Sequence, residues 1–406
     1  MTDRVIAAIL GSERSASAQG PEPELAGRAG LVAAVAAEWS EHVDREARFP
    51  EEAFAAAQSQ RLMGILVPRE LGGEGARLRD VSDICYRLAR VCSSTAMIYA
   101  MHQSCVASIV RHGAENDWHR VLLRRIASDQ LLFASSTTEG QSGGNLRSSV
   151  SPIEREGSHI RLERAATVIS YGARADGIVT TARRSPEAAA TDQVLVTFCR
   201  SDYLLTPTVS WDTLGMRGTC SSGFALNATG LAEQILPEPY ERIHAETMVP
   251  VHHLAWASVW AGIAAGAVER ARAFVRQAAR QGNGALPPAA SQLTLARSGL
   301  MKLRALIATS LRDYEERAED TRALRALEFQ VTVNLTKVDA SELALATVLA
   351  AARACGLSGY RNDSEFSIGR LLRDVLSAPI MINNDRILTN IGSASLMGAL
   401  PAGLHT

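Results

Sequence analysis

The feature that most constrains the fold of this chain of 406 residues is the order of its sequence patterns. A segment with the pattern of β-strands separates two segments with the pattern of helices. From residue 27 to about residue 130, apolar side chains recur at helical spacing, as in Leu31 and Val35. Residues 131–237 hold short apolar and β-branched runs between turn residues, and from residue 247 the helical spacing returns. Few layer architectures place a small β unit between two helical units. The pattern predicts a mainly α protein with a central β domain, of the α+β class.

We expect a flexible N-terminal segment over residues 1–24, a helical domain over 25–130, a middle β domain over 131–240 and a C-terminal helical bundle over 241–406. Strands are expected at residues 160–162, 167–170, 177–181, 194–198 and 224–227. One helix of the bundle is indicated by an apolar stripe at Leu293, Ala296, Leu300, Leu303, Ile307 and Leu311.

Charge and composition exclude several classes of protein. Lys and Arg number 42 against 43 Asp and Glu, so the chain has no overall positive field to hold nucleic acid or an anionic membrane. Hydrophobic residues make up 47% and charged residues 21%, which is typical of a soluble globular protein. The six cysteines lack a paired metal spacing, and we interpret them as reduced thiols.

No targeting or spanning segment is expected from the sequence. The apolar run at residues 5–10 is short and lacks a basic start, so it does not resemble a signal peptide. Residues 254–268 form the most apolar stretch, and they are fewer than the roughly 20 residues needed to cross a bilayer. We therefore expect a cytoplasmic protein without a membrane span.

Four motifs occur in a characteristic order. Residues 68–75 form a proline-then-glycine turn, and residues 138–145 read Thr-Glu-Gly-Gln-Ser-Gly-Gly-Asn. Residues 167–172 read Thr-Val-Ile-Ser-Tyr-Gly, and residues 214–219 read Leu-Gly-Met-Arg-Gly-Thr. In these motifs the chain resembles the acyl-CoA dehydrogenase family, whose members bind FAD between an N-terminal helical domain, a middle β-barrel-like domain and a C-terminal four-helix bundle.

The resemblance implies a set of flavin contacts. Thr138 and Gly143 lie in the loop that the family places beside the flavin, and Ser170 preserves the hydroxyl that reaches the flavin N5 region. Val168 stands where the family has tryptophan, so the pocket is expected to be smaller or filled differently there. The alternative is that Thr138 and Ser170 only cap turns, as most lone hydroxyls in β segments do.

The expected C-terminal bundle contains further segments that resemble those of the family. Arg280 and Gln292 resemble the arginine and glutamine that reach the FAD of a neighbouring subunit, and Gly356 and Gly359 resemble the turn against the FAD diphosphate, with Arg353 nearby. A buried diphosphate needs backbone N–H donors and a cation, which these residues would supply. The alternatives are that the glycines merely end one helix and that Arg280 is solvated.

The catalytic base of the family is missing from its usual positions. Dehydrogenation of a thioester needs a carboxylate that removes the α-proton. Ungapped alignment from the Arg373-Asp374 pair, which we interpret as a buried structural bridge, places Ile382 at the position of the family glutamate.

The second position that the family uses for its glutamate falls near Leu254, which is not acidic either. The nearest carboxylate is Asp385, which we predict to be the base; the alternatives are that it only starts the last helix or pairs with Arg386, and that His252 or His253 is the base.

The sequence therefore predicts an FAD-dependent dehydrogenase of an acyl-CoA or acyl-carrier-protein substrate, with an electron-transfer flavoprotein or another electron acceptor as partner. Two alternatives stay open, a flavin-dependent monooxygenase of the same fold and a catalytically silent subunit. The resemblance also implies a homotetramer or homodimer. Trp256 and Trp260 are candidates to line a substrate pocket in the bundle, although bulky apolar residues on such a helix more often belong to a core.

Overall fold

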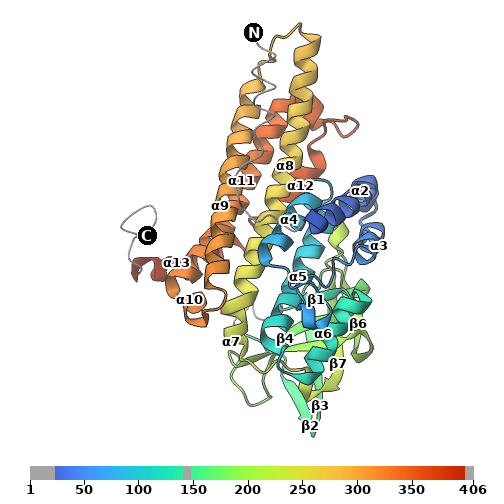
Figure 1. Ribbon diagram of the computed structural model, residues 1–406, viewed down its shortest axis with the longest axis vertical. Helices are drawn as coiled ribbons and strands as arrows, with labels where there is room; N and C mark the ends of the chain where they lie inside the picture. Colours follow the sequence, from blue (N-terminus) through green and yellow to red (C-terminus); the bar gives the residue numbers. More distant parts are fainter. Residues whose placement is uncertain (1–22, 140–147, 398–406) are drawn as a thin grey trace.

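The structure is a computed structural model that describes residues 23–139 and 148–397. It has the predicted order of a helical domain, a β domain and a helical bundle, with the β domain at one end of an elongated molecule (Figure 1). The predicted fold class is confirmed. The expectation of a flexible segment over residues 1–24 lies almost wholly outside the described residues.

The N-terminal domain is built on a nearly buried central helix. Its helices are α2 (Pro23–Glu46), α3 (Glu51–Ser59), α4 (Leu78–Ala89), α5 (Ser93–Gly113) and α6 (Asp117–Asp129). Helix α5 is buried along most of its length, and α4 turns its apolar face, including Val81 and Leu88, into the same core. Gly72 and Gly75 adopt φ values of 89° and 62° in the turn before α4, a conformation that favours glycine.

The β domain consists of two sheets. One has the order β1-β4-β5 and the other the order β2-β3-β7-β6. The strand bounds are β1 (Phe133–Ser136), β2 (Ile153–Glu156), β3 (His159–Ala166), β4 (Gly177–Arg183), β5 (Gln193–Cys199), β6 (Tyr203–Val209) and β7 (Gly223–Leu231). The first sheet is buried on both faces, whereas β3 alternates buried and exposed side chains.

The strand predicted at residues 167–170 is wrong. This segment follows β3 but leaves the sheet, because its backbone turns to a second segment: Ile169 N–H donates to Ser222 O and Tyr171 N–H donates to Thr219 O. The segment at residues 167–171 is thereby fixed against residues 219–222, which brings two of the predicted motifs together.

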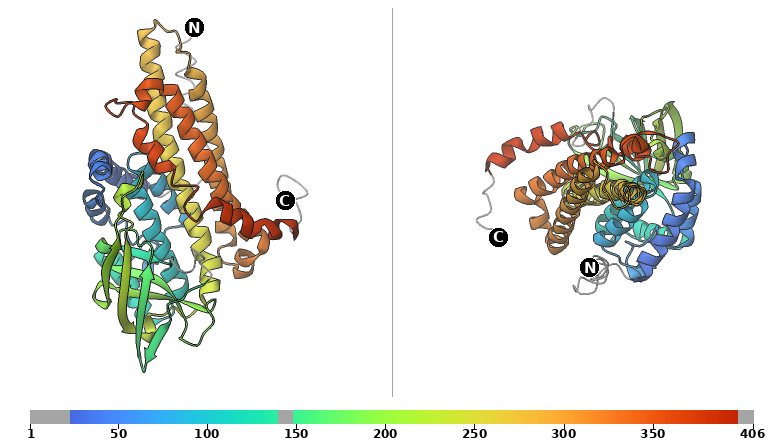
Figure 2. Two further views of the ribbon diagram at one scale, coloured as in Figure 1. Left: turned by 180° about the vertical axis from the view of Figure 1, so that it is seen from behind. Right: turned by 90° about the horizontal axis from the view of Figure 1, so that it is seen from above.

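The bundle is organised around α8. Its elements are α7 (Tyr240–Ile243), a π-helical turn (His244–Met248), α8 (Val249–Gln281), α9 (Ala290–Arg317), α10 (Thr321–Arg325), α11 (Leu327–Tyr360), α12 (Gly369–Val375) and α13 (Asn384–Met397). Gly262 and Gly266 let α4 pack closely on α8, because a Cβ there would lie 2.4 Å from Tyr86 O and 2.5 Å from Arg90 O. Helix α13 extends away from the bundle on the side opposite α2 and α3 (Figure 2).

Within residues 23–139 and 148–397, two helices are long and apolar enough to cross a membrane by length and composition, Tyr240–Gln281 and Leu327–Tyr360. The most apolar window of the first is entirely buried inside the protein, and that of the second is 44% buried. A core helix of a soluble bundle has the same properties, so the absence of a membrane span stays a prediction.

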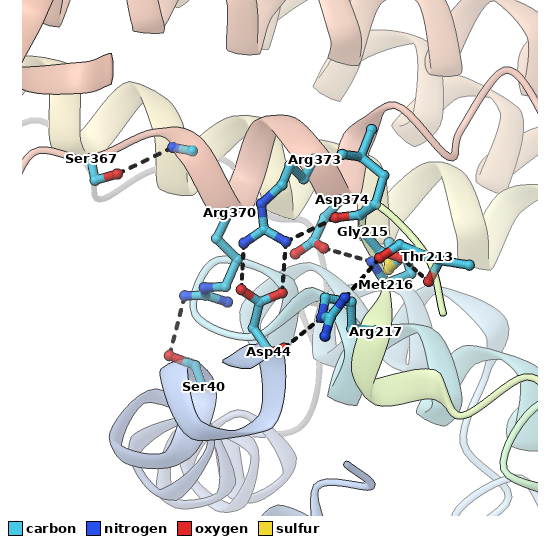
Figure 3. A network of polar contacts seen from close by, with 12 residues as sticks. Ser40, Asp44, Thr213, Gly215, Met216, Arg217, Ser367, Arg370, Arg373 and Asp374 are labelled. Atoms are coloured by element: carbon cyan, nitrogen blue, oxygen red, sulfur yellow. Dashed lines mark hydrogen bonds and ion pairs between the residues drawn. The ribbon is translucent and has the colours of Figure 1, made fainter. Parts of the chain in front are cut away.

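A network of partly buried polar contacts joins the three domains, and we call it the domain junction (Figure 3). Arg373 of α12 forms an ion pair with Asp44 of α2, and its Nη1 also donates to Leu214 O at 2.9 Å. Asp374 accepts a 2.7 Å hydrogen bond from Met216 N–H. Burial raises the pKa of the Asp374 carboxyl. The Arg373-Asp374 pair is therefore structural as predicted, but the two side chains bind different partners instead of each other.

All six cysteines have free thiols. Cys85, Cys92, Cys105 and Cys355 are buried, whereas Cys199 and Cys220 are partly exposed. Burial raises the pKa of the Cys105 thiol to about 12, which keeps it protonated. The interpretation as reduced thiols agrees with this arrangement.

Candidate functional site

A cavity of about 550 Å³ lies where the β domain meets α5, α7, α8 and the segment after α12. Its volume is in the usual range of small-molecule sites. The lining residues from the β side are Ser135, Thr137, Thr138, Glu139, Thr167, Val168, Ser170, Trp211, Met216, Thr219 and Ser221. The lining residues from the helical side are Met97, Met101, Tyr240, His244, Met248, Val249, His252, His253, Trp256, Ser377, Met381 and Ile382.

The β side of the cavity presents hydroxyl groups. Ser221 Oγ donates to Ser170 Oγ at 2.8 Å, and Thr219 Oγ1 lies 2.8 Å from Ser221 Oγ. Thr219 Oγ1 also donates to Met216 O at 2.8 Å, so the three hydroxyls form one hydrogen-bonded chain that ends at Ser170. The segment at residues 167–171 and the turn that ends at Thr219 thus build one hydrogen-bonded edge of the cavity.

Glu139 is the only carboxylate among the described residues that line the cavity. Its side chain is buried and forms an ion pair with Arg164 at 2.8 Å. It also accepts hydrogen bonds from Ser149 Oγ at 3.0 Å and from Val150 N–H at 2.8 Å. The oxygens of this carboxylate are engaged by a cation and two further donors, which fix its position. Glu139 therefore has a structural role.

A stripe of aromatic and sulfur side chains forms the opposite side, and we call it the helical wall. The stripe consists of Tyr240, His244, Met248, His252 and Trp256, with His253 beside it. The five positions of the stripe follow one another at intervals of four residues. Four residues are slightly more than one turn of a straight α-helix, so side chains at this interval would drift gradually around it instead of staying on one face. The π-helical turn at His244–Met248 lies between α7 and α8, within this stripe. Single π turns in helices are frequent at functional sites.

The two adjacent histidines of the helical wall are neutral. His252 Nδ1 contacts Met248 O at 2.7 Å, which assigns the proton to Nδ1 and leaves Nε2 as an acceptor. His253 Nδ1 is buried without a partner among the described residues. Burial lowers the pKa of His252 to about 4, and burial together with Lys337 lowers that of His253 to about 3.

The third side of the cavity is the segment from Ser377 to Ile382, which a buried lysine holds in place. Lys337 Nζ donates to Ala378 O at 3.2 Å and to Asn384 Oδ1 at 2.7 Å. Burial lowers the pKa of Lys337 to about 8. Between these two anchors, Ile382 has a φ of 53°, a left-handed conformation that β-branched residues rarely adopt.

The structure brings together some of the predicted site residues and separates others. Thr138 and Ser170 both line the cavity, and Gly143 lies outside the described residues. Asp385 is exposed in the first turn of α13, where its backbone N–H donates to Asn383 Oδ1, and it does not line the cavity. This placement corresponds to the alternative in which the aspartate only starts the last helix.

The remaining predicted residues lie on the bundle, away from the cavity of their own chain. Arg280 and Gln292 flank the α8–α9 connection, which is at the end of the molecule opposite the β domain (Figure 1). Arg353 and Gly356 are exposed on α11, whereas Gly359 is buried. Gly356 interrupts α11 with φ 54° and ψ −134°, and nothing lies within 4 Å of the position of a Cβ. This backbone conformation is one that glycine adopts without strain.

Two family models match the chain, the acyl-CoA dehydrogenase N-terminal domain over residues 28–129 and the acyl-CoA dehydrogenase C-terminal domain over residues 245–397. The chain belongs to the acyl-CoA dehydrogenase family. Membership makes it a flavin oxidoreductase of an FAD-dependent family.

The relatives of this family member include dehydrogenases. It is 25% identical to the probable acyl-CoA dehydrogenase FadE25 of Mycobacterium tuberculosis over 357 residues, which cover 87% of this chain and 90% of the relative. It is 24% identical to cyclohex-1-ene-1-carbonyl-CoA dehydrogenase of Syntrophus aciditrophicus over 361 residues, which cover 87% of this chain and 84% of the relative.

The similar solved structures include monooxygenases. FMN-bound TdsC of Paenibacillus sp. A11-2, a dibenzothiophene monooxygenase, has a TM-score of 0.81 at 17% identity and covers 93% of this chain and 98% of its own. A nitrososynthase of Micromonospora carbonacea var. africana has a TM-score of 0.79 at 22% identity and covers 94% of this chain and 99% of its own. At these identities the likeness shows the fold alone.

The residues of the cavity fit a flavin ring. An isoalloxazine has two apolar faces and a polar edge, and the cavity offers Met97, Met216 and Trp211 together with the hydroxyls of Thr138 and Ser170. The hydroxyl of Ser170, at the end of its hydrogen-bonded chain, can still form a hydrogen bond with a polar group on that edge.

Tyr240 and His244 were missed by the reasoning from sequence. They lie just before the long apolar part of α8, where neither an apolar stripe nor a family motif marks them. The signal that identifies them is their position four and eight residues before Met248, which lines the cavity in the same helical wall.

Proposed function

We propose that this member of the acyl-CoA dehydrogenase family is a flavin-dependent monooxygenase. It would insert one oxygen atom of O₂ into an apolar substrate and release the other as water, with two electrons from a flavin reduced by an external reductase. The observation that carries the proposal is that the described cavity wall offers no free carboxylate. Oxygenation needs no base to remove an α-proton, whereas thioester dehydrogenation does.

Each candidate base is unsuited to abstraction of an α-proton. Glu139 is held by Arg164, and Asp385 is exposed away from the cavity. His252 and His253 have pKa values lowered by burial to about 4 and about 3, so they are weak bases. Ile382 lines the cavity at the position that the ungapped alignment gives to the family glutamate.

Bound reduced flavin supplies the activation of O₂, and the residues of this chain supply its surroundings. Thr138 and Ser170 would hold the polar edge of the ring, and the buried helical wall would keep water from the reacting atoms. The anchored segment at Ser377–Ile382 would fix the position of the substrate.

A second candidate is the dehydrogenation predicted from the sequence, with an acyl-CoA or acyl-carrier-protein substrate and an electron-transfer flavoprotein as acceptor. It is favoured by the match to FadE25 along 87% of the chain. In this case His252 Nε2, which has no hydrogen-bond partner among the described residues, is the base that the cavity offers in place of Asp385.

Anaerobic and aerobic experiments on the purified holoenzyme separate the two functions. Bleaching of oxidised flavin by an acyl thioester without oxygen would establish dehydrogenation and overturn the proposal. Substrate-dependent incorporation of one ¹⁸O atom from ¹⁸O₂, with a flavin reductase and NADH present, is the result we expect. Hydrogen peroxide without oxygenated product across an apolar and aromatic substrate panel would also contradict it.

We also propose that the protein works as a homotetramer or homodimer in the cytoplasm. Arg280 and Gln292 flank the α8–α9 connection at the far end of the bundle, and Arg353 and Gly356 lie in the last two turns of α11. There they would complete the FAD site of another copy. The bundle also exposes apolar side chains that a second copy would cover, Leu286, Leu295, Met301, Leu357 and Tyr360. Light scattering on the holoenzyme tests the assembly, and a monomer that retains FAD would overturn it.

A further inference from the structure

Three buried polar atoms of the helical wall have no hydrogen-bond partner among the described residues. They are Tyr240 Oη, His253 Nδ1 and Trp256 Nε1, on side chains of residues that are 2%, 3% and 6% exposed. All three residues line the cavity. Buried polar atoms without partners are rare in folded proteins, and each one requires an explanation. A polar ligand in the cavity would supply the missing partners.

Two of these atoms belong to rings that lie close together. The ring centroids of His253 and Trp256 are 6.1 Å apart, and those of His252 and Trp256 are 4.9 Å apart. The indole of Trp256 can only donate. A neutral imidazole has one donor nitrogen and one acceptor nitrogen, and we assign His253 Nδ1 as the acceptor. The ligand group that satisfies both atoms must therefore accept one hydrogen bond and donate another, as a hydroxyl does.

The surroundings of this pair suit a neutral aromatic molecule. Five methionines line the cavity, namely Met97, Met101, Met216, Met248 and Met381. Thioether sulfurs adapt to flat rings and make favourable contacts with them. The described lining residues include no Lys or Arg, and the one carboxylate is paired with Arg164. An anionic group would find no Lys or Arg side chain in direct contact among the described lining residues.

We propose that the helical wall binds an aromatic substrate through a ring hydroxyl, which accepts from Trp256 Nε1 and donates to His253 Nδ1. The inference deepens the proposed oxygenation, since it names the class of its substrate as hydroxyarenes. Tyr240 Oη, farther along the stripe, is left for another polar atom of the bound molecules.

Binding to the holoenzyme with oxidised flavin tests the proposal without turnover. Calorimetric titration compares 2-naphthol with 2-methoxynaphthalene, which has the same ring but no hydroxyl proton. We expect 2-naphthol to bind at least about tenfold more tightly, because the ether leaves the buried His253 acceptor unpaired. Equal affinities of the wild-type protein for the two compounds would overturn the proposal, and this comparison does not depend on any variant.

A pair of tryptophan variants locates the effect. Trp256→Phe removes the donor and keeps a ring, so we expect it to weaken 2-naphthol at least about fivefold. Trp260→Phe is the matched control, because the Trp260 indole N–H is also buried without a partner among the described residues but does not line the cavity. It should leave the affinity unchanged, and equal effects of both variants would contradict the assignment.

The outcomes separate this inference from the proposed function. Incorporation of ¹⁸O into other substrates without a preference for 2-naphthol would overturn the hydroxyarene class and leave the oxygenation standing. A preference for 2-naphthol combined with anaerobic bleaching by an acyl thioester would overturn the oxygenation and leave hydroxyl recognition by the helical wall standing.

Discussion

The domain junction and the helical wall are both rich in buried polar groups, but they differ in how those groups are satisfied. At the junction, Asp374 accepts from Met216 N–H and Arg373 binds both Asp44 and Leu214 O. On the helical wall, Tyr240 Oη and Trp256 Nε1 have no partner among the described residues. Polar groups that are fully paired within the chain fix the arrangement of domains, whereas groups left unpaired on a cavity mark where a ligand binds.

A substitution that breaks the domain junction is expected to have the largest effect on stability. Asp374→Ala leaves Met216 N–H buried without an acceptor, and we expect it to lower the free energy of unfolding by about 3 kcal/mol. Urea unfolding measures the change. Asp212→Ala is the control in the same region, because Asp212 pairs with Arg217 but is almost fully exposed, and we expect little change. Equal stabilities of the two variants would contradict the role of the junction.

The second prediction concerns acid and the helical wall. Burial lowers the pKa of His252 to about 4, below the ordinary value of 6.5, so between these values this residue binds one more proton in the unfolded chain than in the folded one. The contribution of neutral His252 to the free energy of unfolding is therefore complete above about pH 6.5. It is lost as the pH falls toward 4, at about 1.4 kcal/mol per pH unit. Urea unfolding at pH 5, 6 and 7 should show a shallower dependence in His252→Gln. If the free energy of unfolding depends on pH equally in the variant and the wild type, His252 does not contribute to the acid sensitivity.

The third prediction compares one tyrosine that is paired with one that is not, and its effect is the smallest. Tyr171 Oη donates to Phe133 O at 2.9 Å, so Tyr171→Phe should lower the free energy of unfolding by about 1 kcal/mol. Tyr240→Phe removes an unpaired buried hydroxyl and should leave stability unchanged or raise it. Thermal unfolding of the two variants checks the difference, and an equal loss in both would show that Tyr240 Oη has a partner.

The domain order was predictable because it depends on periodicity, which the buried faces of α4 and α9 impose directly on the sequence. Strands β2 and β6 were not predicted, since β2 has one buried apolar residue and β6 is mostly exposed and contains Pro207. The strand expected at residues 167–170 failed for another reason. Its backbone partners come from residues 219 and 222, some 50 positions away, and no local pattern records such pairing.

The β side of the site was easier to predict than the helical side. Thr138 and Ser170 are carried by motifs that resemble the family, and both line the cavity. Asp385 was selected by sequence distance from Ile382, but the left-handed turn at Ile382 and Asn383 starts a new helix that carries Asp385 to the surface. The helical wall depends on a π turn, which helical periodicity alone does not reveal.

The most direct test of the account is a crystal structure of the holoenzyme with 2-naphthol bound. We predict that this structure will show a ligand oxygen within about 3.2 Å of both Trp256 Nε1 and His253 Nδ1, with the ring among the cavity methionines. If protein atoms occupy those hydrogen-bonding positions instead, or if the oxygen points to the β side of the cavity, the central claim about the helical wall is contradicted.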